Sequence, residues 1–207
     1  MVIGTLIVGP LQVNCYFVGC SKTREVFIID PGDHPEEIRR FLSERNLIPQ
    51  AILNTHGHID HVGAVAELKT SLKIPYYLHE ADTMFLTSLP EQSKELGLYI
   101  SGIPEPDGFL ENDQLLSVGM ESFRVLHTPG HTPGGICFLW ENALFTGDTL
   151  FAGSVGRCDL PGGDFAILRQ SINSQLLHLP GNTKIYPGHG PVSTIEKEKK
   201  YNPFLII

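Results

Sequence analysis

Short hydrophobic runs, separated by Gly, Pro and polar residues, divide the chain into predicted strands. The runs are rich in Val, Ile and Phe, which are enriched in strands, and they end at turn-forming residues. The predicted strands are Met1–Val8, Val13–Val18, Glu25–Asp30, Ala51–Asn54, Pro75–Leu78, Ser122–Leu126, Gly135–Trp140, Ala143–Thr146 and Lys184–Tyr186. They come in runs with helices after them, without a regular alternation of strand and helix. This order predicts two β-sheets packed on each other with helices outside, rather than a doubly wound parallel sheet.

Hydrophobic residues at helical spacing predict helices between these strands. The first begins at Pro35, because proline suits the first turn of a helix. Others are expected over Val62–Leu72, His79–Leu89 and Phe165–Leu179. The segment Pro90–Gln114 is long and full of helix-breaking residues. Such a segment is typical of a surface connector or, alternatively, of a lid over a site.

The stretch ILNTHGHIDHVG, from Ile52 to Gly63, concentrates His56, His58, Asp60 and His61 on the loop between a predicted strand and a predicted helix. Residues two apart in an extended segment point to the same side, so His56 and His58 can converge on one ion. Asp60 and His61 follow where the chain turns into the helix and can point elsewhere. One site with four ligands is possible, but two adjacent sites are the more natural arrangement.

Imidazole and carboxylate groups are the usual protein ligands of zinc, and also of iron and manganese. The cluster contains no cysteine, which argues against a closed structural zinc site. The alternative is that these histidines cap a helix and fill a polar core. The pattern is too dense for chance at this composition, so we favour metal binding.

Three further candidate ligands stand beside glycine where predicted strands meet loops. They are His131 in HTPGHTPGG, Asp148 in LFTGDTLF and His189 in YPGHGP. Glycine lets the backbone bend and lets an ion approach closely. With the first cluster, these residues would supply five imidazoles and two carboxylates, enough for two divalent ions. Two ions so ligated would generate a nucleophile from water at neutral pH.

Composition limits the partners and the compartment. The 207 residues carry a formal net charge of −8, from 15 Lys and Arg against 23 Asp and Glu, without a basic run that would favour nucleic acid. No apolar run approaches the length of a membrane span, and no basic residue precedes Lys22 as a secretory signal would require. The four cysteines form no CxxC pair. Scattered free thiols suit a reducing compartment, so we expect a cytoplasmic protein without nucleic-acid or membrane partners.

The order THGHIDH, TPGHTPG, FTGDTLF and YPGHGP, preceded by IDPG at Ile29–Gly32, resembles the metallo-β-lactamase superfamily over nearly the whole chain. Within it, the closing segment GSVGRCDLPGGD is similar to the short glyoxalase II-like hydrolases. The resemblance implies a single domain over residues 1–207, with an α+β fold: a four-layer αββα sandwich of two mixed β-sheets. It also implies a ligand set: His56, His58 and His131 for one ion, Asp60, His61 and His189 for the other, and Asp148 between them. Asp30 would orient a ligand.

The activity implied is hydrolysis of a small, glutathione-linked thioester such as S-lactoylglutathione, by attack of a metal-bound hydroxide. Zinc is the expected metal, with iron or manganese as alternatives. Asp60 could assist proton movement, and Arg157 could bind an anionic part of the substrate or form a surface ion pair. The chain ends soon after His189, so the C-terminal helical domain that helps longer glyoxalase II enzymes hold glutathione is expected to be absent. The alternatives are a mono-iron glutathione persulfide dioxygenase and, less favoured, a metallo-nuclease, a lactonase or a non-enzymatic metal-binding module.

Overall fold

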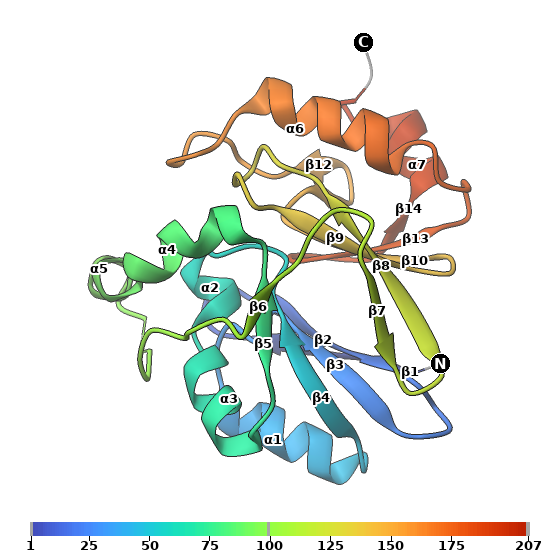
Figure 1. Ribbon diagram of the computed structural model, residues 1–207. Coiled ribbons are helices and arrows are strands. Elements are labelled where there is room, and N and C mark those ends of the chain that lie inside the picture. The colour runs from blue at the N-terminus through green and yellow to red at the C-terminus, as the bar shows by residue number, and fades with distance from the viewer. Residues whose placement is uncertain (1, 99, 206–207) are drawn as a thin grey trace.

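Two six-stranded β-sheets packed face to face form the centre of the molecule (Figure 1). The computed structural model describes residues 2–98 and 100–205, so Met1 of the first predicted strand lies outside the described residues. Helices cover the outer face of each sheet. The predicted αββα sandwich of two mixed sheets is therefore confirmed.

The first sheet has the strand order β1-β2-β3-β4-β5-β6. β1 to β3 pair antiparallel and β3 to β6 pair parallel, so the carboxyl ends of β3, β4 and β5 lie at one edge. Its strands are β1 (Val2–Val8), β2 (Val13–Gly19), β3 (Glu25–Ile29), β4 (Ile48–Leu53), β5 (Tyr76–Leu78) and β6 (Gly108–Phe109).

The second sheet has the order β14-β13-β10-β9-β8-β7. All its neighbours are antiparallel except β10 and β13. Its strands are β7 (Leu115–Val118), β8 (Glu121–His127), β9 (Ile136–Trp140), β10 (Ala143–Gly147), β13 (Lys184–Pro187) and β14 (Ser193–Thr194). A separate short hairpin pairs β11 (Leu150–Phe151) with β12 (Ser154–Val155).

The helices divide between the two outer faces and one edge of the sandwich. On the side of the first sheet and at the edge lie α1 (Pro35–Glu44), α2 (Ile59–Val62), α3 (Val65–Leu72), the short η1 (Glu80–Asp82), α4 (Thr83–Thr87) and α5 (Leu89–Leu96). On the second sheet lie α6 (Phe165–Ser171), its π-helical continuation η2 (Ile172–Leu176) and α7 (Ile195–Tyr201).

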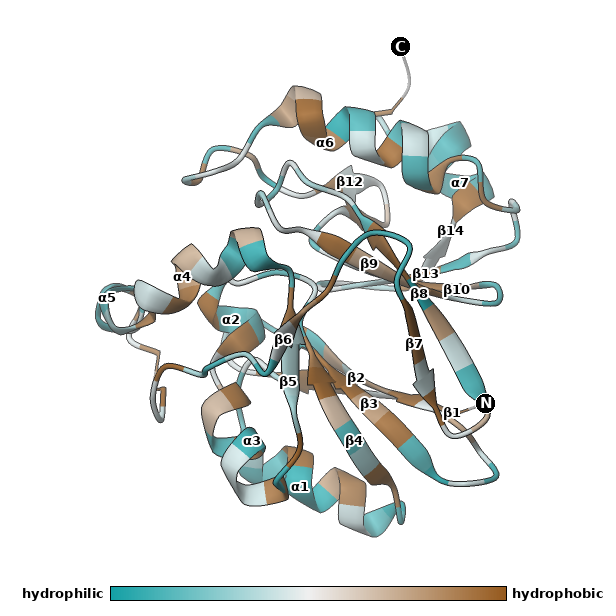
Figure 2. Ribbon diagram, in the orientation of Figure 1, coloured by the Kyte–Doolittle hydropathy of each residue, from teal (hydrophilic) through white to brown (hydrophobic). Residues whose placement is uncertain are grey.

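Three buried hydrophobic clusters separate these layers. One joins the first sheet to its helices and includes Phe17, Ile38 and Leu68. A second fills the space between the sheets, and a third lies between the second sheet and α6 and α7. Figure 2 shows the corresponding pattern, with hydrophobic stretches along the facing strands and hydrophilic residues on the outer turns of the helices.

Local predictions differ from the structure in four places. His79–Leu89 is not one helix but passes through η1 and α4 into α5. Pro90 does not begin the connector, because it occupies the first turn of α5, where its missing N–H is not needed. Phe165 was expected on the buried face of α6 but is 45% exposed, while Leu168 and Ile172 are buried. The strand Leu115–Val118 was not predicted.

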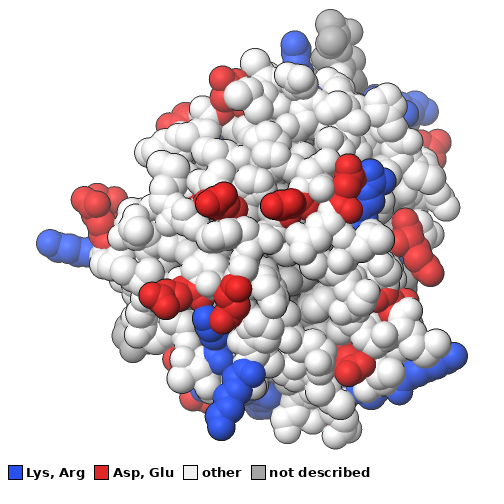
Figure 3. Space-filling model, viewed as in Figure 1, with Lys and Arg blue, Asp and Glu red and all other residues white. Residues whose placement is uncertain are grey.

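The surface is mixed in charge. On the face shown in Figure 3, Lys and Arg side chains are scattered near the periphery and interspersed with Asp and Glu. Over residues 2–98 and 100–205, no helix combines the length and apolar character needed to span a membrane.

Candidate metal centre

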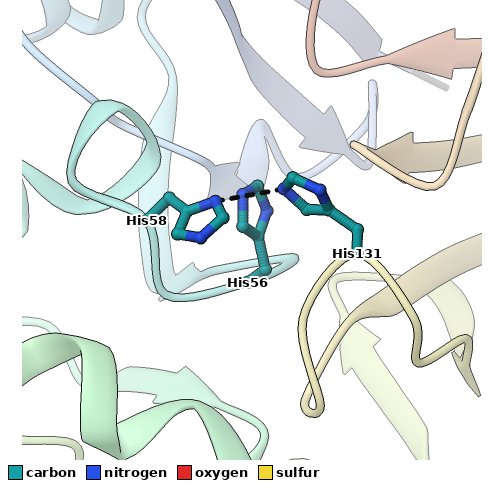
Figure 4. A group of neighbouring side chains, drawn as sticks. All are labelled: His56, His58 and His131. Carbon is teal, nitrogen blue, oxygen red and sulfur yellow. Dashed lines mark hydrogen bonds between the residues drawn. The ribbon is translucent and has the colours of Figure 1, made fainter. Parts of the chain in front are cut away.

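The histidine-rich loop lies where the parallel strand β4 ends at Leu53 and α2 begins at Ile59. The backbone at His58 is extended (φ −69°, ψ 149°), and the chain turns into α2 directly afterwards. His131 arrives from the loop between β8 and β9, so the three imidazoles meet from two separate parts of the chain (Figure 4).

His56, His58 and His131 form the first group. One ring nitrogen from each lies within 4.8 Å of the others, an arrangement that could hold a metal ion. His58 Nδ1 and His131 Nε2 are 3.0 Å apart (Figure 4). His56 and His131 are buried, and His58 is half-buried.

Asp60, His61 and His189 form a second group with the same potential. Asp60 Oδ2 lies 3.7 Å from His61 Nε2 and 3.3 Å from His189 Nε2. Asp60 is grouped with His61 and His189 and not with His56 and His58, which agrees with the expectation that the end of the motif turns elsewhere. His189 comes from the loop after β13, at the far end of the chain.

Asp148 lies between the two groups, one residue beyond β10. Its Oδ2 is 3.8 Å from His131 Nε2 and 3.6 Å from His189 Nε2, and its Oδ1 is 3.5 Å from His61 Nε2. One carboxylate therefore faces histidines of both groups. The structure thus brings together all seven side chains that the sequence proposed as ligands.

Backbone carbonyls determine which nitrogen His131 and His189 present. His131 Nδ1 donates to the carbonyl of Arg157 at 2.7 Å, and His189 Nδ1 donates to the carbonyl of Leu11 at 3.0 Å. A carbonyl can only accept, so Nδ1 carries a proton in both rings. Nε2 is therefore the nitrogen that each ring turns toward the other proposed ligands.

Asp30 performs the same task for His61 and, through Thr55, for His56. His61 Nδ1 donates to Asp30 Oδ2 at 3.0 Å. The Thr55 hydroxyl donates to that same oxygen at 2.6 Å, so it accepts the bond from His56 Nδ1 at 3.1 Å. Asp30 also accepts from the backbone N–H of Thr55 and from Asn54 Nδ2. Such carboxylate–histidine contacts orient metal-binding imidazoles.

The pKa values of His56 and His58 in the first group are lowered, whereas the pKa of His61 in the second group is raised. Burial, followed by the charges of the neighbouring imidazoles, lowers the pKa of His56 far below its ordinary value, and burial and His131 lower the pKa of His58 to about 3. These two rings are neutral at pH 7 and can donate lone pairs. Burial also disfavours charge on His61, but Asp60 and Asp148 outweigh it and raise the pKa of His61 to about 10. Carboxylates that favour a proton there would equally favour a metal cation.

The buried polar atoms test whether the residues suit metal ions. His56 Nε2, His61 Nε2 and Asp148 Oδ1 are buried, have no hydrogen-bond partner in the structure and form a third potential ligand triplet. Leaving such atoms unpaired is costly, and cations held by the two groups would satisfy all three. The side chains of Asp60 and His189 are 17% and 30% exposed, so the centre is reachable from solvent on that side. The residues therefore fit divalent ions in an accessible centre, unlike a closed structural site.

Arg157 lies beside the centre, but its side chain points to another partner. The guanidinium is 62% exposed and makes two hydrogen bonds to the Asp159 carboxylate, at 2.7 and 2.8 Å. The contact that Arg157 makes to the centre is through its backbone carbonyl, which holds His131.

Thr55 and Asp82 were missed by sequence reasoning. Asp82 is completely buried and accepts hydrogen bonds from both loops of the first histidine group. A signal was present, because Asp30, Thr55 and Asp82 all follow parallel strands whose carboxyl ends meet at one sheet edge. Polar residues in those positions gather around a common site.

Comparison with known proteins matches residues 8–189 to a family model described as metallo-beta-lactamase superfamily. Among curated relatives, the hydroxyacylglutathione hydrolase GloC of Haemophilus influenzae is 39% identical over 207 residues, covering 96% of this chain and 95% of the relative.

Two solved structures are similar over nearly their full lengths. The BLEG-1 B3 metallo-beta-lactamase gives a TM-score of 0.91 at 39% identity, covering 99% of each chain. TTHA1623, solved in a di-iron-bound form, gives a TM-score of 0.90 at 44% identity, covering 98% of this chain and 100% of that one. Sequence and three-dimensional similarity therefore point to the same group of proteins.

Proposed function

This chain belongs to the metallo-β-lactamase superfamily and is a metal-dependent hydrolase; we propose that it cleaves acyl thioesters such as S-lactoylglutathione. The observation that carries this proposal is the pair of histidine–aspartate groups with Asp148 between them. The choice of a glutathione thioester is supported by the GloC relative.

In this assignment His56, His58 and His131 would hold one divalent ion, and Asp60, His61 and His189 would hold a second, with Asp148 available to both groups. Zinc is the metal we expect, and iron or manganese would suit the same donors. When bound, the two ions supply positive charge for a substrate carbonyl and make a water molecule nucleophilic near neutral pH. Asp30 keeps His61 in the required orientation and, through Thr55, does the same for His56.

The remaining residues perform the proton and substrate steps. The Asp60 carboxylate lies at the accessible side of the centre, where an oxygen can briefly accept a proton during attack, although ligation is its main role. A thiol leaves with a pKa of about 8.5, so it departs as a thiolate without a strong general acid. That suits a centre whose acidic groups are engaged with histidines. Arg157, exposed beside the His131 loop, could bind a carboxylate of the substrate if it exchanges its bond to Asp159.

Iron-dependent oxygenation of a persulfide is the second candidate. One observation bears on the metal that it needs: TTHA1623, at 44% identity, has been solved with iron bound, although with two irons. The paired groups in this chain favour hydrolysis, because the dioxygenase alternative requires one iron and not two.

We expect the purified protein to hydrolyse S-lactoylglutathione in the absence of oxygen. A thiol reagent would follow glutathione release under anaerobic conditions, with chelator-treated protein as the control. Oxygen consumption with glutathione persulfide and no thioester cleavage would reverse the ranking of the two candidates. A chromogenic β-lactam belongs in the same assay, since cleavage of that substrate alone would move the activity towards the BLEG-1 relative.

The metal content is a separate prediction. We expect two transition-metal ions per chain, spaced by roughly 3.5–4 Å as in other two-metal centres. Elemental analysis of the fully loaded protein measures the stoichiometry, and X-ray absorption measures the metal–metal distance. A reproducible value of one ion per chain would contradict the paired assignment and strengthen the mono-iron alternative.

A further inference from the structure

Asp82 joins the two loops that carry His56, His58 and His131. It ends η1, after β5, and its carboxylate is completely buried. Both of its oxygens accept hydrogen bonds, and these come from two backbone N–H groups and a threonine hydroxyl, not from a charged side chain or from one of the seven proposed ligands. The carboxylate therefore has a task other than ligation or surface charge.

The hydrogen bonds of Asp82 connect the loop of His56 and His58 with the loop of His131. Asp82 Oδ2 accepts from the Gly57 N–H at 2.9 Å, between His56 and His58. The same oxygen accepts from the Thr132 hydroxyl at 2.8 Å, and Oδ1 accepts from the Gly134 N–H at 2.6 Å. Both Thr132 and Gly134 lie in the loop of His131. One buried carboxylate thus ties together two segments that are more than seventy residues apart in sequence.

The glycines in these loops allow this approach. A Cβ at Gly134 would lie 2.6 Å from Asp82 Oδ1, and a Cβ at Gly57 would lie 2.8 Å from the Asp82 carbonyl oxygen. Neither distance leaves room for a side chain. The motifs THGH and HTPGG therefore place glycine where the backbone must contact Asp82.

The helix that follows adds a second support. Phe85, one turn beyond Asp82 in α4, packs edge-to-face on the His58 ring with centroids 5.0 Å apart. The second group is held differently, because His61 bonds to Asp30 and His189 bonds to the Leu11 carbonyl. Asp82 and Phe85 thus support only the first group.

We propose that Asp82 is the positioning residue of the first metal group: by bonding both loops, it sets the separation of His58 and His131. This inference rests on the ligand assignment of the proposed function. It predicts an asymmetric effect, in which loss of the Asp82 carboxylate lowers the binding affinity for one ion and leaves the affinity for the other unchanged. Loss of a residue needed only for folding would lower the binding affinity for both ions together or for neither.

The test compares Asp82→Asn with a matched buried carboxylate elsewhere. Asparagine keeps one accepting oxygen, but its NH2 group cannot accept, so one loop loses its partner while the side chain keeps its size. Glu198 is 1% exposed and accepts bonds from Gly153, Ser193 and Asn202, so Glu198→Gln makes the same chemical change away from the histidine loops. Thr132→Val removes one bond to Asp82, and Thr132→Ser restores its hydroxyl.

Two measurements are made on each full-length variant. Competition with a chelator gives the affinity of each ion, and NMR of a spin-active cadmium isotope distinguishes the site with three imidazoles from the site with two imidazoles and the Asp60 carboxylate. In Asp82→Asn we expect the ion at the three histidines to bind about 10–100-fold more weakly, with less than about threefold change in the other. Thr132→Val should show a smaller loss at that same ion, and Thr132→Ser and Glu198→Gln should resemble the parent protein.

Amide hydrogen exchange on the metal-free protein supplies the independent readout. At least one of the Gly57 and Gly134 amides should exchange faster in Asp82→Asn, and both should remain protected in Glu198→Gln. Equal weakening of both ions, or unchanged protection of the two glycine amides, would overturn the proposal. If the parent protein bound no metal but the two loops loosened together, the tie between the loops would stand and the proposed function would fail.

Discussion

Asp148→Asn is expected to release at least one metal ion and to lower kcat/KM by more than about 100-fold, since even a residue that only supports a metal ligand is worth 10–100-fold. The Asp148 carboxylate faces His131 and His189 with one oxygen and His61 with the other. Asparagine keeps the shape but removes the negative charge between two cations and one strong oxygen donor. Elemental analysis and the thioester assay measure the two effects on the same sample.

The control for this prediction is Asp113→Asn. Asp113 is an exposed loop residue that bonds to Arg124, and its positive φ of 66° is one that asparagine also adopts readily. It should retain both ions and normal turnover. Retention of two ions and near-parental activity by Asp148→Asn would show that the assignment of the carboxylate between the groups is wrong.

The sequence could predict which side chains lie together, because the candidate ligands stand in short motifs that can be recognised without the fold. His56, His58, Asp60 and His61 fall within six positions, and no ordinary folding requirement produces that density. His131, Asp148 and His189 each stand beside glycine after a strand, which marked them individually. Spacing also indicated that the end of the first motif turns away from its beginning, and the structure places Asp60 in a different group from His58.

The supports of the centre could not be predicted in the same way. The carbonyls of Leu11 and Arg157 hold two histidines, and every residue has a carbonyl, so sequence cannot distinguish these two. Asp82 appears in sequence as a helix-starting acid, yet its carboxylate makes no cap to its own helix. Its role depends on two loops that only the folded sheet brings together. Arg157 was noted in the sequence for its side chain. The structure shows that this side chain forms an ion pair with Asp159, and its role in substrate binding stays a proposal.

The fold followed from hydrophobic pattern where elements are long. The predicted runs at β2, β3, β8 and β9 agree with the observed strands to within a residue or two at each end, because continuous apolar segments are needed between two packed layers. Prediction failed where the local sequence is compatible with more than one structure. Pro90 was taken as a break, although the first turn of a helix accepts proline, and the half-exposed strand β7 lacks a continuous apolar run.

Gly188→Ala is expected to abolish metal binding at one or both groups and to lower activity by about 100-fold or more, the loss that a displacement of about 1 Å can cause. A Cβ at Gly188 would lie 2.3 Å from Asp148 Oδ1 and 2.7 Å from His61 Cε1. The backbone cannot withdraw easily, because the Gly188 N–H donates to the Gly147 carbonyl and its own carbonyl accepts from Asn14 N–H, both at 2.8 Å. The added methyl group must therefore displace a proposed ligand. Metal analysis and thermal unfolding would measure the loss.

Gly190→Ala, two positions further along the same YPGHGP motif, separates this steric effect from general damage to the loop. Among the described residues, none beyond its two chain neighbours has an atom within 4 Å of a Cβ at Gly190, but its φ of +77° disfavours alanine. We expect that variant to lose about 1–2 kcal/mol of unfolding free energy while keeping both ions. The two glycines of one motif then have different reasons to be glycine: Gly188 makes room for Asp148 and His61, and Gly190 allows the turn after His189. Full metal content in Gly188→Ala, or metal loss confined to Gly190→Ala, would contradict this division.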